Sequence, residues 1–357
     1  MKRRKTRTVR IGDVYIGSDH PVSIQSMTNT VTADIPATVS QIKRLEKAGC
    51  EIVRVSVKSP EDAKAVEDIR EEIGIPLVAD IHFDHRLALE AVKRGADKIR
   101  INPGNIRRKD HIDRVISACR ERGVPVRIGV NSGSLTESAS GKGKPCDVMV
   151  SSLLGYMEHF RKAKFDDLVI SLKSSDVETT VKAYRLMADE CDHPFHLGVT
   201  AAGTRDNGIV KASIGIGSLL LDGIGDTVRV SLTAAPEEEV TAAKRILSSV
   251  GSRKFGHEII ACPTCGRCQV DLEPIVNEIE KALCGSRFAV RGSKKHLLIA
   301  VMGCEVNGPG EAKAADVGIA FGKGKGAIFK EGKIIRTVNA DIAVRELMSI
   351  IEAEGKE

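Results

Sequence analysis

Four cysteines and a glutamate near the C-terminus have the residue types and spacing of a metal site. They are Cys262, Cys265 and Cys268 in CPTCGRC, then Cys304 and Glu311 in MGCEVNGPGE. Thiolates at C-x2-C spacing, completed by a distant ligand in a turn rich in glycine and proline, bind zinc ions and iron–sulfur clusters. The sequence therefore predicts a metal centre in this part of the chain.

The cysteine spacing favours an iron–sulfur cluster over zinc but leaves the set of ligands open. A C-x2-C-x2-C run begins the cluster loop of bacterial ferredoxins, yet no fourth cysteine with its proline follows Cys268. A zinc ribbon would need a second C-x2-C pair, which the sequence lacks. Two sets remain: the first three cysteines with Cys304, or two of them with Cys304 and Glu311.

Eight short runs rich in valine and isoleucine precede this region, each followed by a segment with helical periodicity. Such alternation is typical of a parallel α/β domain, and eight units predict a (β/α)8 TIM barrel over residues 1–247. The main alternative, a doubly wound sheet, requires a glycine-rich turn that is absent after the first run. The predicted strands are Ser23–Asn29, Ile52–Val57, Leu77–His82, Lys98–Asn102, Val126–Asn131, Leu168–Lys173, His196–Thr200 and Thr227–Leu232.

Polar residues occupy alternate positions toward the C-terminal ends of these predicted strands. They are Arg54 and Ser56, Asp80 and His82, Arg100 and Asn102, Arg127 and Asn131, Ser171 and Lys173, His196 and Thr200, Arg229 and Ser231. Side chains alternate across a strand, so these residues should point together into the usual active-site mouth of a barrel. Four arginines and a lysine there suit a phosphate or diphosphate.

Two alternatives apply to this polar set. The cations could lie on the outer face and pair with helix carboxylates, although five cations at matching positions favour the anion pocket. Asp80 and His82 could form a polar pair that acts as an acid in the mouth, or a structural hydrogen bond.

In residues 248–357 the predicted helices and strands no longer alternate as they do in the barrel. Their order predicts a small α+β domain that carries the cysteines. The expected elements are a helix over 271–283, strands over 296–303 and 317–321, a hairpin that begins near residue 322, and a final helix over 341–353.

Composition narrows the class of protein further. No apolar run approaches the roughly 20 residues that span a bilayer, and the basic N-terminus has no apolar segment behind it. We therefore expect a cytoplasmic protein without membrane partners. The net charge is +6, but three tyrosines, eight phenylalanines and no tryptophan offer little surface for stacking bases, which disfavours nucleic acid. A small anionic substrate fits better.

Long motifs spread over the whole chain resemble one family, the bacterial 4-hydroxy-3-methylbut-2-enyl diphosphate synthases (GcpE family). They are SIQSMTNT, ADIHF, IRINPGN, VRIGVNSGSL, LGVT, GIGDTVRVSL, ACPTCGR and MGC-x-VNGPGE. The resemblance implies reductive ring opening of 2-C-methyl-D-erythritol 2,4-cyclodiphosphate, with two electrons consumed and water lost, in the methylerythritol phosphate pathway to isoprenoids. It also implies a [4Fe-4S] cluster, reduced flavodoxin or ferredoxin as the donor, and a homodimer in which one subunit's cluster domain caps the other's barrel.

The resemblance also assigns roles to residues. The implied cluster ligands are Cys262, Cys265, Cys304 and Glu311, with Cys268 only a neighbour. As an oxygen ligand that can leave iron, Glu311 would be both ligand and gate, and Asp80 and His82 join it as predicted catalytic residues. The implied substrate contacts are Arg54, His82, Arg100, Asn102, Arg127, Asn131, Lys173, Arg229 and Ser231.

One position departs from the family pattern. Relatives read LGITEAG where this chain reads LGVTAAG, so a barrel-mouth glutamate is Ala201 here. Loss of a positioned acid typically lowers a rate about 10²- to 10⁴-fold. Either Asp80, a water or another carboxylate substitutes for it, or activity is impaired.

Two other functions are compatible with the residues alone. One is a zinc-bearing barrel whose small domain binds a partner or RNA. The other is a metal-free barrel lyase that acts on a sugar phosphate.

Overall fold

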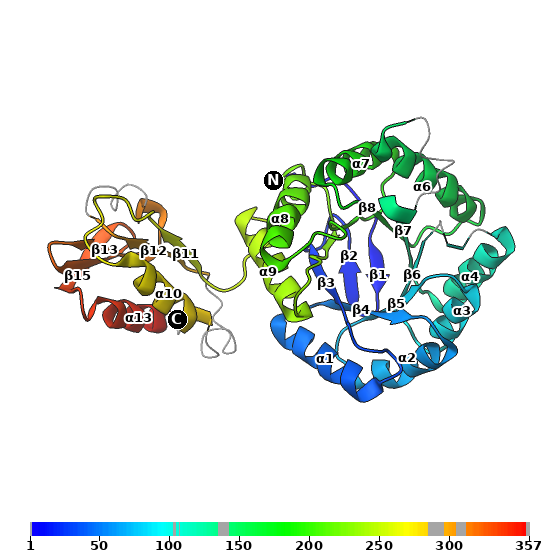
Figure 1. Cartoon of the computed structure of the whole chain (residues 1–357), viewed down its shortest axis with the longest axis horizontal. Coiled ribbons are helices and arrows are strands. Elements are labelled where there is room, and N and C mark those ends of the chain that lie inside the picture. The colour runs from blue at the N-terminus through cyan, green and yellow to red at the C-terminus, as the bar shows by residue number, and fades with distance from the viewer. Residues whose placement is uncertain are drawn as a thin grey trace. The chain divides into compact units, whose positions relative to one another are not determined.

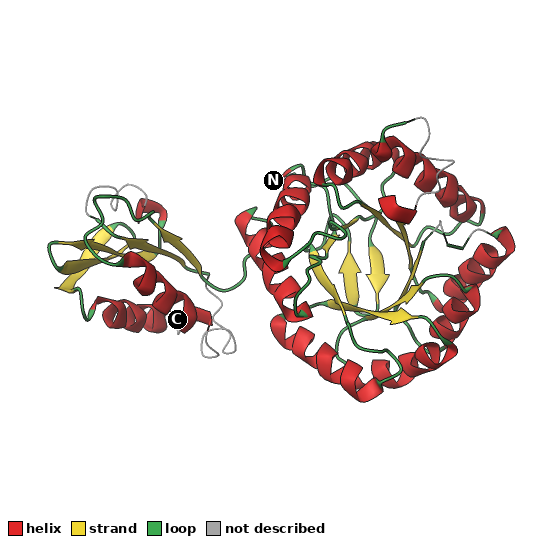
Figure 2. Ribbon diagram, in the orientation of Figure 1, coloured by secondary structure: helices red, strands yellow, loops and turns green. Residues whose placement is uncertain are grey.

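The computed structural model describes residues 2–102, 105–106, 108–134, 143–284, 296–304 and 312–354. The chain divides into two compact units, Met1–Arg253 and Lys254–Glu357, and each is described by itself. Figure 1 labels the elements, and Figure 2 separates helices from strands by colour. No helix among these residues is both long and apolar enough to cross a membrane.

The first unit is a TIM barrel, as predicted. Its eight strands are all parallel and neighbour one another in the order β8-β7-β6-β5-β4-β3-β10-β9. A parallel bridge between Ile170 and Phe195 joins the two ends of this sheet. The strands are β3 Ser23–Met27, β4 Ile52–Val57, β5 Leu77–Ile81, β6 Lys98–Ile101, β7 Val126–Asn131, β8 Leu168–Lys173, β9 His196–Leu197 and β10 Thr227–Val228.

Helices follow the strands and form a ring around the barrel, which Figure 2 shows end on. Several begin with a side-chain cap: Asp34, Ser59, Asp84 and Asp176 each accept a backbone N–H of the first turn. The helices are α1 Ile35–Ala48, α2 Pro60–Glu72, α3 His85–Lys93, α4 Lys109–Arg122, α6 Pro145–Lys162, α7 Val177–Glu190, α8 Arg205–Leu221 and α9 Pro236–Ser249. Short 3₁₀ turns lie at Ser132–Ser134 and Ala312–Ala314.

Strands β9 and β10 are shorter than predicted, two residues each. Their regular pairing stops where Gly198 passes close to the next strand. A Cβ atom at Gly198 would lie 2.6 Å from the carbonyl oxygen of Arg229 and 2.6 Å from Lys173 Nζ. Only glycine fits this approach, and the segment that follows runs into the barrel mouth outside the ladder.

A hairpin that the sequence analysis missed lies across one end of the barrel. It consists of β1 Val9–Ile11 and β2 Val14–Ile16 and lies at the centre of the ring in Figure 1. Val9, Ile11 and Ile16 pack on the barrel residues Ile52, Val78 and Val169. Since those residues stand near the starts of their strands, the hairpin plugs the N-terminal end, and the polar interior faces the opposite mouth.

The second unit is an α+β domain built on a five-stranded sheet. The sheet has the order β11-β12-β13-β14-β15, and its apolar core includes Ile299, Ile319 and Leu347. The elements are β11 Glu258–Ala261, β12 Leu298–Met302, β13 Val317–Gly322, β14 Lys325–Lys330, β15 Lys333–Asn339, α10 Leu272–Cys284 and α13 Ala343–Glu354.

Strand β11 was not predicted, and it determines where the cysteines lie. β11 and β12 are parallel neighbours, with Ala261 opposite Val301. Their C-terminal ends therefore meet at one edge of the sheet. Cys262 follows β11 directly, and Cys304 follows β12, so two distant segments of sequence arrive side by side.

Candidate active site

A buried carboxylate organises one half of the barrel interior. Asp80 Oδ1 accepts a hydrogen bond from Arg100 Nη1 at 2.9 Å, and Asp80 Oδ2 lies 3.5 Å from Arg54 Nε and 3.8 Å from His82 Nε2. Burial alone would raise the pKa of Asp80. The charges of Arg54, Arg100 and Arg127 and of His82 outweigh it and hold that pKa well below its usual range. Asp80 is therefore an ionised anchor that orients cations.

A second carboxylate, which sequence reasoning missed, organises the other half. Glu239 on α9 lies 3.4 Å from Arg229 Nε. Its carboxylate also accepts hydrogen bonds from Ser26 Oγ and from the backbone N–H of Leu232, each at 3.1 Å. Met27 Sδ lies between the two halves, 3.0 Å from Arg54 Nη2 and 3.8 Å from Arg229 Nη1. Both arginines are thus held in place by fixed neighbours.

Several buried cations in the same interior have polar atoms without a hydrogen-bond partner among the described residues. These atoms are Arg100 Nε, Arg127 Nε and Nη1, and Lys98 Nζ. Arg127 and Lys98 are 1% and 0% exposed. Unpaired buried donors are costly, so an interior that retains several of them is suited to an anion.

Charges from opposite sides of the barrel act on one another. Burial, followed by Arg127, Arg54, Arg229 and Arg100, lowers the pKa of Lys173 well below its ordinary value. Lys173 is on β8 and Arg54 on β4, four strands away around the sheet. Charges on strands this far apart act on one another when both face the shared interior, so these cations lie inside the barrel, where Asp80 on β5 and Glu239 on α9 are carboxylates beside them.

The structure brings most of the predicted polar residues together inside the barrel. Asn102 is buried and Asn131 and Ser231 are half-buried, at or just beyond the C-terminal ends of β6, β7 and β10. Lys98 was missed although it has the parity of Arg100, two positions before it. It was not predicted because it lies at the start of its strand, whereas site residues were expected at the C-terminal ends.

Ala201 stands at the mouth, just after β9, with an unusual backbone. Its φ is 48°, in the left-handed region that residues with a side chain seldom adopt, and it is exposed. A longer side chain at this position would start from the rim of the pocket.

Cys262, Cys268 and Cys304 lie near one edge of the sheet in the second unit. The backbone N–H of Gly303 donates to Cys262 Sγ at 3.2 Å, and the N–H of Cys262 donates to the carbonyl of Val301 at 3.3 Å. Cys268 Sγ lies against Gly303: it is 2.3 Å from where a Cβ atom of that glycine would be. Cys304, next in sequence, is buried, whereas Cys265 is exposed.

These residues fit an iron–sulfur cluster in part. A backbone N–H donated to a cysteine sulfur is a contact that stabilises a thiolate ligand, and two cysteine-bearing loops share one edge. Among the described residues, however, no three potential ligands stand ready around one metal position. Glu311 lies outside the described residues, so its predicted role stays a prediction.

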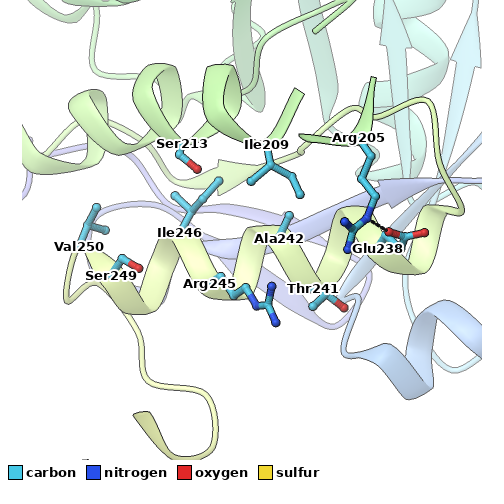
Figure 3. A pocket seen from close by; sticks show the side chains of 10 residues that line it. All are labelled: Arg205, Ile209, Ser213, Glu238, Thr241, Ala242, Arg245, Ile246, Ser249 and Val250. Atoms are coloured by element: carbon cyan, nitrogen blue, oxygen red, sulfur yellow. Dashed lines mark hydrogen bonds and ion pairs between the residues drawn. The ribbon is translucent and has the colours of Figure 1, made fainter. Parts of the chain in front are cut away.

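A hollow on the outside of the barrel lies between α8 and α9. Figure 3 shows Ile209, Ala242 and Ile246 forming its apolar floor, with an ion pair between Arg205 and Glu238 at one end. None of the predicted site residues lines it. The chemistry-bearing residues are in the barrel interior and at the cysteine edge.

A buried histidine gives the barrel a predicted pH dependence. Burial, then Lys173, Arg127, Lys98 and Arg54, lowers the pKa of His196 well below its ordinary value. As the pH falls, the unfolded chain therefore takes up the proton before the folded chain does. The free energy of unfolding should be highest above about pH 6.5 and should decrease as the pH falls below that value, by up to about 1.4 kcal/mol per pH unit. Urea denaturation at about pH 7 and about pH 5 should show a smaller loss for His196→Gln than for the wild type. Equal losses would contradict this assignment.

The fold and the two clusters of polar residues define a class of protein: a TIM barrel with a cationic interior joined to a domain that carries cysteines. Residues 6–244 match the GcpE TIM-barrel domain, and residues 258–353 match the GcpE protein C-terminal domain. The chain therefore belongs to the GcpE family, as the sequence motifs indicated.

Two relatives that match this chain over nearly its full length have the same name. A protein of Clostridium perfringens is 52% identical over 354 residues, with 99% of each chain covered, and is a 4-hydroxy-3-methylbut-2-en-1-yl diphosphate synthase (flavodoxin). A protein of Thermodesulfovibrio yellowstonii with the same name is 50% identical and covers 98% of this chain and 99% of its own.

Solved structures support the barrel alone. The Bacillus subtilis spore coat polysaccharide biosynthesis protein spsE has a TM-score of 0.51 and 10% identity, over 69% of this chain and 72% of its own. The dihydropteroate synthase of Xanthomonas albilineans has a TM-score of 0.50 and 14% identity, over 69% of this chain and 98% of its own. At these identities the likeness concerns the fold.

Proposed function

We infer that this chain is an oxidoreductase of isoprenoid precursor synthesis. It converts 2-C-methyl-D-erythritol 2,4-cyclodiphosphate to (E)-4-hydroxy-3-methylbut-2-enyl diphosphate by reductive ring opening and loss of water. The observation that carries this inference is a set of buried barrel cations that have polar atoms without a hydrogen-bond partner among the described residues, Arg127 above all. The 52% identity to a synthase of that name supports it.

The barrel would hold the substrate by its two phosphates. Arg100 and Arg54 are oriented by Asp80, and Arg229 is oriented by Glu239, so their remaining N–H groups are fixed before a ligand arrives. Forked guanidinium donors match phosphate oxygens, and donors fixed in advance lose little entropy on binding. Asn102, Asn131, Lys173 and Ser231 remain predicted contacts of the same substrate.

The second unit would hold a [4Fe-4S] cluster through Cys262, Cys265, Cys304 and Glu311. When bound, the cluster supplies electrons one at a time to the ring carbon whose C–O bond breaks. The chain's own part is to keep the Cys262 sulfur hydrogen-bonded by the Gly303 amide and the Cys304 side chain buried from solvent. Both features favour retention of a thiolate site.

Electrons would come from a protein donor. The relatives are named as flavodoxin-dependent, which supports flavodoxin over ferredoxin for this chain. The substrate site and the cysteine edge belong to separate units of the chain. A homodimer in which one subunit's second unit serves the partner's barrel remains our proposal.

Proton delivery is the part of the reaction for which this chain differs from its family. Asp80 is held ionised by Arg100 and Arg54, so it is a poor substitute for the missing acid. His82 is better placed, because its side chain is 38% exposed and its ring stands at the mouth beside that carboxylate. We propose that His82, or a water it holds, takes part in proton transfer.

The Ala201→Glu variant tests this division of roles. A glutamate at residue 201 would place a carboxyl at the rim of the pocket, and we expect turnover with a chemical reductant to rise about 100-fold, the lower end of the range for a positioned acid. Ala201→Gln, which has the same shape without the acid, should not produce the increase. An equal gain from both variants, or no gain from Ala201→Glu, would mean that this acid is dispensable here.

Metal content separates this proposal from its alternatives. Protein purified without oxygen should be brown and contain iron and acid-labile sulfide. A colourless protein with zinc would favour a zinc-bearing binding module, and a metal-free protein that cleaves a sugar phosphate would favour a lyase. Neither activity is in the names of the relatives quoted above.

A further inference from the structure

Three buried side chains at the floor of the barrel have polar atoms without a hydrogen-bond partner among the described residues. Lys98 on β6, Arg127 on β7 and His196 on β9 are 0%, 1% and 0% exposed. Lys98 Nζ, Arg127 Nε and Nη1, and His196 Nε2 have no hydrogen-bond partner among the described residues. Each is aligned with interior positions of its strand.

These groups are close enough to act on one another electrostatically. Arg127 and Arg54, after burial, lower the pKa of Lys98, and Lys98 and Arg127 are among the charges that lower the pKa of His196. Lys98 belongs to the lowest interior layer, opposite Val78, which packs on the β1–β2 hairpin. Its apolar stem suits that layer.

The hydrogen bond that His196 makes is compatible with donation toward the same space. His196 Nδ1 lies 2.7 Å from Thr227 Oγ1. If the threonine hydroxyl donates to Nδ1, the neutral ring carries its proton on Nε2, which then becomes a donor. Lys98, Arg127 and His196 would then each offer a buried N–H donor without a partner among the described residues. Buried donors without a hydrogen-bond partner are expensive to keep, so their presence indicates a function that needs an anion.

We propose that Lys98, Arg127 and His196 form a phosphate subsite on the barrel floor, one layer below the ring of predicted substrate contacts. This inference rests on the proposed function, since it gives one of the two phosphates of a cyclic diphosphate its deepest contacts. The ligand class is a phosphate group of a diphosphate. Arg127 belongs to both sets, and Lys98 and His196 are new.

The test measures binding and stability together on the full chain. Inorganic pyrophosphate is titrated calorimetrically into the wild type, Lys98→Met and Lys98→Gln, and the melting temperature of each protein is recorded without ligand. Loss of one charge-assisted contact should weaken pyrophosphate binding about 10- to 100-fold. The melting temperature should stay equal or rise, because removing an unpaired buried ammonium relieves a cost of folding.

A matched control and a kinetic measurement sharpen this result. Lys109→Met makes the same chemical change at an exposed residue on α4 and should leave Kd unchanged. In turnover with a chemical reductant, both Lys98 variants should raise KM for the cyclic diphosphate more than they lower kcat.

Three outcomes overturn the inference and differ in meaning. Wild-type binding with unchanged Kd in both Lys98 variants shows that the floor does not contact phosphate, while the proposed function stands. Weaker binding with a lower melting temperature in both variants shows that Lys98 supports the fold. No pyrophosphate or cyclic diphosphate binding by the wild type removes the anion pocket and the proposed function with it.

Discussion

Replacing Cys304 by serine is expected to remove the cluster and to reduce turnover of the cyclic diphosphate by more than about 100-fold. Cys304 is buried and follows Gly303 directly. The amide of Gly303 donates to Cys262 Sγ, and this hydrogen bond connects the two cysteine-bearing loops. A serine hydroxyl is a poorer iron ligand than a thiolate. Iron and acid-labile sulfide per chain, measured without oxygen beside the rate, give both halves of the result.

Cys268 provides the control for that experiment. Its Sγ donates to the carbonyl of Val270 at 3.2 Å and packs on Gly303. We expect a residue with these contacts to be a neighbour of the cluster. Cys268→Ala should therefore keep its iron and most of its activity. A Cys304→Ser protein that turns over normally would favour the metal-free lyase. Loss of iron from Cys268→Ala equal to that from Cys304→Ser would move Cys268 into the ligand set.

Asp80→Asn is expected to destabilise the barrel by about 3–5 kcal/mol, the range for removing one member of a buried charge network. Asp80 is 3% exposed and offsets the charges of Arg54, Arg100 and Arg127. An asparagine leaves these cations without their counter-charge. The free energy of unfolding from urea denaturation measures the effect, and pyrophosphate should restore part of it because it supplies negative charge to the same cations.

Asp84→Asn is a matched control for this change. Asp84 is a partly exposed N-cap of α3 and is paired with Arg86. Asparagine caps a helix as well as aspartate does, and an ion pair near the surface contributes little. We expect a loss below about 0.5 kcal/mol. The folded pKa of Asp80 is depressed, so its stabilising contribution is present above about pH 4 and disappears as the pH falls through the folded pKa. Equal losses from the two variants would contradict the anchoring role of Asp80.

The barrel could be predicted from sequence because its strands obey one rule. Each is a short run of valine and isoleucine, and polar residues such as Arg54, Asp80 and Arg100 interrupt it on alternate positions. In a buried parallel strand, the interior of a barrel accommodates such residues. The alternation of polar and apolar residues therefore predicted both the fold and the location of the pocket.

Residues whose position depends on tertiary contacts could not be found in this way. Glu239 is one glutamate in a helical EEE run, and nothing local distinguishes it from its half-buried neighbours. The β1–β2 hairpin has strands of three residues among basic side chains, and its burial comes from the barrel it plugs. Strand β11 is likewise defined by its pairing with β12.

The metal site shows a similar limit. Cysteine spacing indicated a centre but could not choose among four thiolates and a carboxylate, because ligand choice depends on how two distant loops meet. The structure brings Cys262 and the segment of Cys304 together and places Cys268 Sγ against Gly303. The assignment of Glu311 still rests on the family resemblance.

Formation of the allylic diphosphate is the most direct test of the central claim. Full-length protein, reconstituted with iron and sulfide without oxygen, is given 2-C-methyl-D-erythritol 2,4-cyclodiphosphate and reduced flavodoxin, and the product is quantified by mass spectrometry. The proposed function predicts (E)-4-hydroxy-3-methylbut-2-enyl diphosphate in amounts beyond one turnover, and none when iron is omitted. An iron-loaded protein that leaves the substrate unchanged with both flavodoxin and a chemical reductant would contradict it.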